Sequence, residues 1–150
     1  MSNYKWPLNV NNFTFFDKLK ICKFILNPCN RWTQDIQVKK FEEKFAKFVG
    51  SKYAIFVSSG STANTLIAMY LRDSADNRKT IIFPSTTWVT SVSPFIREGF
   101  CPKFIDVSLS DLSLDLDKLE VYLAQFSDKV ACIFITSLLG FTPDLNRLVD

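Results

Sequence analysis

Residues 57 to 64 read Val57-Ser58-Ser59-Gly60-Ser61-Thr62-Ala63-Asn64, a run of small residues that joins an apolar stretch to a helix-patterned segment. The first backbone N–H groups of a helix have no intrahelical acceptor and lie at its positive end, so a phosphate can bind there. Gly60 lets a ligand approach the backbone, and the hydroxyls of Ser59, Ser61 and Thr62 add donors. On its own the motif is more typical of serine and threonine that merely cap a helix.

Apolar stretches and helix-patterned segments alternate along the rest of the chain. We expect strands at residues 53–57, 80–83, 103–107 and 130–136. We expect helices at residues 13–26, 38–49, 62–71, 88–97 and 116–126. Strands separated by helices predict an α/β fold, with a mainly parallel sheet and helices on both faces. Ligands of such sheets bind beyond the carboxyl ends of the strands.

Composition excludes several classes of function. The net charge of +3 is too small to indicate a nucleic-acid partner, and the 47% hydrophobic content is typical of a globular core. The four cysteines form no C-x-x-C pair and there is no histidine, so we expect no metal site and no Ser-His-Asp chemistry. No secretory signal or membrane span is evident, which predicts a cytoplasmic protein without a membrane partner.

Trp88 is the second informative residue. It follows Pro84-Ser85-Thr86-Thr87 at the start of an expected helix, on the same sheet edge as the serine-rich bend. An indole there could stack on a flat ligand, or it could pack into the core. Together with a phosphate-binding bend it describes a site for a nucleotide or pyridoxal phosphate (PLP). The four glycines allow neither G-x-G-x-x-G nor a P-loop.

The order of the motifs resembles the DegT/DnrJ/EryC1/StrS family of PLP enzymes, which act on nucleotide-linked keto-sugars. The residues that carry the resemblance are Arg31-Trp32-Thr33, residues 38–50, residues 53–61, Pro84-Ser85-Thr86-Thr87-Trp88, residues 102–107, residues 116–120 and Leu138-Leu139-Gly140. The similarity therefore spans nearly the whole chain in the family's order.

The resemblance implies a partial PLP-dependent transferase major domain of the aspartate aminotransferase type. It implies an N-terminal segment at residues 1–33 and an incomplete PLP-binding domain at residues 34–150. Carried over by position, Gly60, Ser61 and Thr62 hold the cofactor phosphate and Trp88 stacks on its pyridine ring.

The family's remaining catalytic groups have no counterpart in these residues. The aspartate that pairs with the pyridinium nitrogen and the lysine that forms the Schiff base come later in the family's order, so we assign no catalytic residue here. We expect the chain to be the N-terminal part of a longer enzyme, or a truncated product. In that case the strand at residues 53–57 would lack its neighbours.

Two reactions and two non-catalytic or unrelated roles remain open. The leading expectation is amino transfer from a donor such as glutamate to a nucleotide-linked keto-sugar, by an enzyme that is a homodimer when complete. The variant Gly60-Ser61-Thr62-Ala63-Asn64 resembles the branch that includes sugar 3-dehydratases, and Ser137 stands where many members carry histidine. The third hypothesis is an inert fragment that associates with a relative, and the fourth is a phosphate-binding domain of a non-PLP enzyme.

Overall fold

The computed structural model describes residues 12–74 and 76–149. Contacts divide the chain after Phe56 into two compact units. The division into an N-terminal segment at residues 1–33 and an incomplete domain at residues 34–150 stays a prediction.

The described residues of the first unit, 12–56, form two helices whose bounds are close to the expected ones. Helix α1 (Phe15–Leu26) begins with a capping box, in which the Asp17 N–H donates to Thr14 Oγ1 at 3.2 Å and the Thr14 N–H donates to Asp17 Oδ2 at 3.0 Å. Helix α2 (Ile36–Val49) ends at Gly50, whose φ of 73° lies in the left-handed region that favours glycine.

The strand expected at residues 53–57 is not formed. No described strand lies alongside it, so its backbone has no ladder partner and cannot be part of a sheet. One of its backbone groups is satisfied otherwise, because the Phe56 N–H donates to Glu42 Oε1 at 2.8 Å. The side chains of Tyr53 and Ile55 remain exposed. The expectation of four strands is therefore wrong for the described residues, where three are paired.

The second unit is built on a parallel sheet of three strands in the order β2-β1-β3. These strands are β1 (Thr80–Pro84), β2 (Cys101–Ile105) and β3 (Val130–Ile133). The register pairs Thr80 with Cys101 on one side of β1 and Ile82 with Ile133 on the other. The sequence prediction of a mainly parallel sheet is confirmed.

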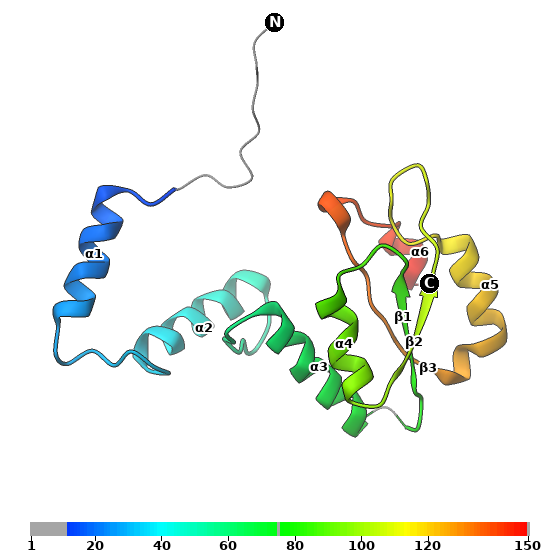
Figure 1. Ribbon diagram of the computed structural model, residues 1–150, viewed down its shortest axis with the longest axis horizontal. Coiled ribbons are helices and arrows are strands. Elements are labelled where there is room, and N and C mark those ends of the chain that lie inside the picture. The colour runs from blue at the N-terminus through cyan, green and yellow to red at the C-terminus, as the bar shows by residue number, and fades with distance from the viewer. Residues whose placement is uncertain (1–11, 75, 150) are drawn as a thin grey trace, which may run out of the picture. The chain divides into compact units, whose positions relative to one another are not determined.

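Helices cover both faces of this sheet (Figure 1). They are α3 (Gly60–Ser74), α4 (Val89–Arg97), α5 (Leu116–Phe126) and the short α6 (Leu145–Val149). Successive side chains of β1 point to opposite faces of the sheet, as in any β-strand. Ile81 and Phe83 pack with α3 and α4, whereas Ile82 packs with Leu119 of α5. Two buried clusters therefore hold the sheet between its helix layers.

Candidate functional site

The serine-rich bend caps helix α3. The Thr62 N–H donates to Ser59 Oγ at 3.2 Å, and the Ala63 N–H donates to the Ser59 carbonyl at 3.1 Å. The Thr62 hydroxyl is also hydrogen-bonded to the hydroxyls of Ser58, at 3.2 Å, and Ser59, at 3.0 Å. Ser59 is thus the N-cap, and the Thr62 side chain is held within the bend.

Capping leaves two donors of the bend free within the described residues. Neither the Gly60 N–H nor the Ser61 N–H donates to any described acceptor, as expected for the first positions of a helix. A Cβ at Gly60 would meet nothing within 4 Å, and the φ of Gly60 is not in the left-handed region. Neither packing nor backbone conformation therefore requires glycine here. Its small size instead leaves the two N–H groups open to a ligand from outside.

A groove of about 420 Å³ lies beside the bend, between α3 and α4. Its described lining consists of Ser61, Thr62, Thr65, Ser93, Pro94 and Arg97. Three hydroxyl-bearing residues of α3 thus line the same groove as Arg97 of α4. The Arg97 guanidinium is already paired with the Glu98 carboxylate at 3.4 Å. Ser61 and Thr62, but not Trp88, belong to this lining.

Trp88 is the N-cap residue of α4, and the residue is 70% exposed. The alternative interpretation, in which this side chain packs into the core, is therefore wrong. Its side chain makes no capping hydrogen bond, so the helix does not explain why tryptophan occupies this position.

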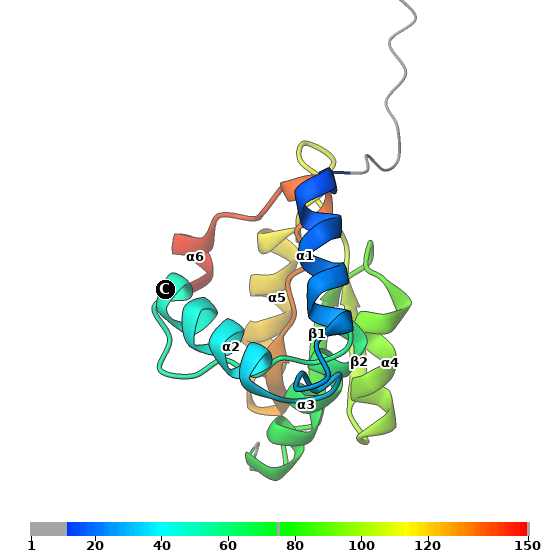
Figure 2. The same cartoon turned by 90° about the vertical axis from the view of Figure 1, so that its left-hand side faces the viewer.

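Helices α3 and α4 lie side by side and begin at the same end (Figures 1 and 2). Near their starts, Asn64 Nδ2 donates to the Thr90 carbonyl at 3.3 Å. Near their ends, the Arg72 guanidinium pairs with the Glu98 carboxylate. The hydrogen bond from Asn64 to Thr90 thus links the first turn of α3, which follows the bend, to the first turn of α4, which follows Trp88.

Hydrogen bonds to β2, to Asp106 and to the segment after β3 hold the loop between β1 and α4. The Ser85 N–H donates to the Ile105 carbonyl at 2.8 Å, and the hydroxyls of Thr87 and Thr136 are hydrogen-bonded at 2.7 Å. Asn64 and Thr136 carry no motif that predicts a role at the site. Their partners lie 26 and 49 residues away in the chain, so no local pattern could have indicated them.

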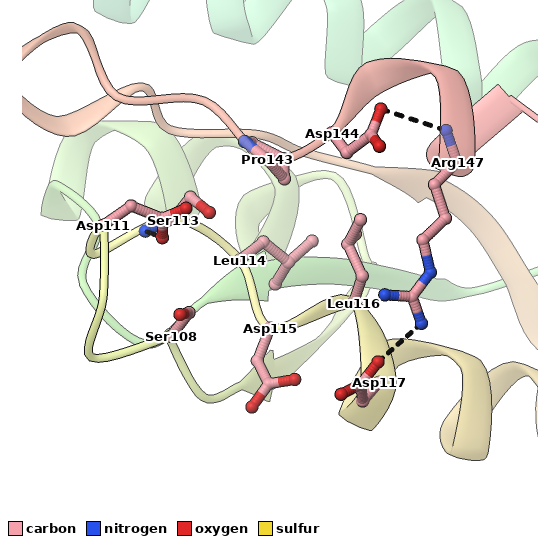
Figure 3. Close-up of a pocket in the computed structure, with 10 residues that line it drawn as sticks. All are labelled: Ser108, Asp111, Ser113, Leu114, Asp115, Leu116, Asp117, Pro143, Asp144 and Arg147. Carbon is pink, nitrogen blue, oxygen red and sulfur yellow. Dashed lines mark hydrogen bonds and ion pairs between the residues drawn. The ribbon is translucent and has the colours of Figure 1, made fainter.

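A second hollow, of about 250 Å³, lies where the loop after β2 meets the start of α5 and α6 (Figure 3). Asp115 and Asp144 accept backbone N–H groups at the starts of these two helices. The Arg147 guanidinium donates to Glu120 at 2.8 Å and to Asp117 at 2.6 Å, and these bonds raise its pKa. The charged side chains of this hollow thus have partners in helix caps and ion pairs.

Within the described residues, no group of three or more His, Cys, Asp or Glu side chains is placed to hold a metal ion. In the same part of the chain, no helix has the length and apolar character needed to cross a bilayer.

The model of the DegT/DnrJ/EryC1/StrS aminotransferase family matches residues 23–150. The chain belongs to this family. The GDP-4-keto-6-deoxy-D-mannose 3-dehydratase of Yersinia pseudotuberculosis is 33% identical over 123 residues, which cover 79% of this chain and 30% of that protein. The dTDP-3-amino-3,6-dideoxy-alpha-D-galactopyranose transaminase of Aneurinibacillus thermoaerophilus is 27% identical over 112 residues, covering 75% of this chain and 30% of that protein.

A solved structure gives the same family relationship in three dimensions. The E. coli GDP-4-keto-6-deoxy-D-mannose-3-dehydratase with bound hydrated PLP matches with a TM-score of 0.82 and 30% identity. The match covers 96% of this chain and 37% of that chain. The fold is therefore part of the PLP-dependent transferase fold, as the sequence resemblance implied. The chain spans about a third of the length of the family members that it matches.

One lysine of this family member is engaged in structural contacts near the carboxyl end of the sheet. Lys118 Nζ donates to Asp106 Oδ2 at 2.9 Å and lies 3.3 Å from Asp115 Oδ2. The hydrogen bond from Lys118 lowers the pKa of Asp106 and raises the pKa of the Lys118 ammonium. The described contacts of the Lys118 ammonium are thus structural ion pairs with Asp106 and Asp115.

Proposed function

We propose that this chain is the N-terminal part of a PLP-dependent enzyme that acts on nucleotide-linked keto-sugars. Gly60, Ser61 and Thr62 would bind the cofactor phosphate, and Trp88 would stack on the pyridine ring. The observation that carries the proposal is the pairing of open N–H groups and an exposed indole at the same end of α3 and α4.

The donor set fits an aromatic phosphate ester. The two free N–H groups of the bend and the positive end of a 15-residue helix favour the binding of a dianion. The open space at Gly60 admits phosphate oxygens to within hydrogen-bonding distance of the backbone. The Trp88 indole offers an apolar face of the size of a pyridine ring.

The residues of this chain would bind and orient the cofactor. Bound PLP supplies an electron sink for carbanion chemistry. Gly60 and Ser61 donate N–H groups to the phosphate, and Trp88 fixes the plane of the ring. Groups that move protons at the substrate are not assigned to any residue described here.

Between the two reactions, 3-dehydration is favoured by similarity. The 3-dehydratase of Y. pseudotuberculosis is 33% identical to this chain, whereas the A. thermoaerophilus transaminase is 27% identical. Amino transfer to a keto-sugar is the second candidate. In both cases we propose a nucleotide-sugar substrate, an amino donor such as glutamate, a homodimeric assembly and a cytoplasmic location.

Cofactor binding is tested by titrating PLP into the complete gene product that carries this chain. We expect Trp88→Ala to raise the Kd for PLP about fivefold, because an aromatic contact contributes roughly 1 kcal/mol. Trp32→Ala is the matched control, since the Trp32 side chain is also 70% exposed. Equal affinities of the two variants would contradict the role of Trp88, and absence of PLP binding by the unsubstituted protein would contradict the function.

The reaction is tested by mass spectrometry after incubation with GDP-4-keto-6-deoxy-D-mannose, glutamate and PLP. Loss of the 3-hydroxyl group supports dehydration, and replacement of the keto oxygen by an amino group supports transfer. If PLP binds and neither product forms from this or other nucleotide-linked keto-sugars, the inert association role is favoured instead.

A further inference from the structure

The hydroxyl pair between Thr87 and Thr136 links two parts of the second unit that are far apart in the chain. The two Oγ1 atoms are 2.7 Å apart and half-buried. Thr87 directly precedes Trp88, and Thr136 lies in the segment that follows β3. The segment is itself attached to the sheet, because the Phe134 N–H donates to the Ile82 carbonyl at 2.8 Å.

Trp88 depends on such a link for its position. An indole that is 70% exposed gains little from packing, and the residue makes no side-chain cap to α4. Its carbonyl accepts the Ser91 N–H at 2.9 Å, which fixes the helix start but not the preceding peptide. On the other side, the loop is attached to β2 at Ser85. The Thr87 hydroxyl is therefore the described side-chain anchor closest to the indole along the chain.

We propose that Thr136 is a positioning residue for Trp88. Through the Thr87 hydroxyl it holds the indole in place before the cofactor binds, so that stacking requires less ordering of the loop. This inference rests on the proposed function, because it takes Trp88 to stack on the ring. The inference distinguishes two parts of the site. Thr136 affects the contact between Trp88 and the ring, whereas the phosphate contact at Gly60 and Ser61 does not depend on Thr136.

The test compares Thr136→Val, which removes the hydroxyl and keeps the shape, with Thr136→Ser, which keeps the hydroxyl. In the complete gene product we expect Thr136→Val to raise the Kd for PLP about fivefold, the effect of one net hydrogen bond. We expect the Kd for inorganic phosphate to stay unchanged. Thr136→Ser should restore PLP binding. Thr86→Val is the matched control, because Thr86 lies in the same loop and its exposed hydroxyl has no described partner.

A second readout does not require the cofactor. When every other tryptophan of the complete gene product, including Trp6 and Trp32, is replaced by phenylalanine, the fluorescence anisotropy of Trp88 reports the local motion of its indole. We expect Thr136→Val to lower this anisotropy, Thr87→Val to lower it equally, and the double variant to lower it no further. Anisotropy at the unsubstituted value in both single variants would overturn the inference.

The two proposals fail in different ways. If the unsubstituted protein does not bind PLP, the proposed function fails, while the anisotropy still tests whether Thr136 positions Trp88. If PLP binds and Thr136→Val weakens phosphate and PLP equally, the positioning role is overturned and the proposed function stands. If Thr136→Val proves too unstable to measure, Thr87→Val removes the same bond from the other side and decides the point.

Discussion

At the scale of single residues, Ser59 combines a structural role with a place beside the proposed phosphate. Its Oγ accepts the Thr62 N–H, so Ser59→Ala should lower the free energy of unfolding by about 1 kcal/mol. Ser59→Asp should keep the cap and most of the stability, because aspartate is an equally good N-cap. The added negative charge should nevertheless weaken PLP binding by repelling the phosphate. Urea unfolding and PLP titration measure the two effects separately.

Ser58→Ala serves as the control for these variants. Ser58 is exposed and contacts only the Thr62 hydroxyl among its described hydrogen bonds, so its removal should change stability by less than about 0.5 kcal/mol. If Ser59→Asp binds PLP as tightly as the unsubstituted protein does, the phosphate is not at this bend.

Local sequence predicted the bend better than it predicted the contacts around it. Gly60 to Thr62 do begin a helix, and the capping and anion-site interpretations turn out to be compatible because they use different N–H groups. Of the two alternatives for Trp88, its observed exposure excludes packing into the core, and stacking on a ring stays a prediction. The contacts of Asn64 and Thr136 depend on how distant segments pack, which no short motif encodes.

At the scale of elements, the start of α5 carries a pH-dependent contribution to stability. Asp115 accepts the Lys118 N–H at 3.2 Å, and this bond lowers the pKa of the Asp115 carboxyl below its ordinary value. A lowered pKa in the folded state means that the contribution is present above about pH 4 and is lost as pH falls through the folded value.

We therefore expect the Asp115→Asn variant, which retains a capping oxygen but does not titrate, to differ most from the unsubstituted protein at neutral pH. The difference in free energy of unfolding should shrink as pH falls from about 5 to below about 3. Thermal unfolding across this range measures it. A difference that stays constant across the range would show that ionisation of Asp115 contributes nothing to α5.

The bounds of helices were predicted more closely than those of strands, because the backbone hydrogen bonds of a helix lie within one segment of the chain. The bounds of α5, Leu116–Phe126, agree with the expected segment, and its N-cap is the expected Asp115. A strand needs a neighbour. Residues 53–57 have the apolar composition of a strand but no described partner, and they form none.

At the scale of the whole molecule, the second unit depends on aromatic packing under one face of its sheet. Phe83 is fully buried, and its ring lies 5.7 Å from that of Phe95 and 5.4 Å from that of Phe134. Phe83→Ala should lower the free energy of unfolding by about 3–5 kcal/mol, because it leaves a cavity that these neighbours cannot fill. Phe141→Ala, at a side chain that is 51% exposed in the same unit, should cost less than about 1 kcal/mol.

Chemical denaturation followed by circular dichroism measures both variants. Similar losses for Phe83→Ala and Phe141→Ala would mean that the sheet is not held by this cluster.

The class of fold could be predicted from alternation alone, and the family from the order of motifs. The number of paired strands could not, since it depends on which segments meet. Likewise, the sequence indicated a bend and an indole at one edge. It did not indicate that Asn64 links the starts of α3 and α4, or that Thr136 holds the loop before the indole through Thr87.

The central place of β1 has a consequence for how this unit opens. With β2 on one side and β3 on the other, β1 can release its backbone only if the ladders on both sides come apart. Its amide hydrogens should therefore be the last of the unit to exchange with deuterium, and those of residues 53–55 among the first of the chain. The loop that carries the indole begins directly after this strand, so the edge proposed to face the ligand is anchored to the most protected part of the unit.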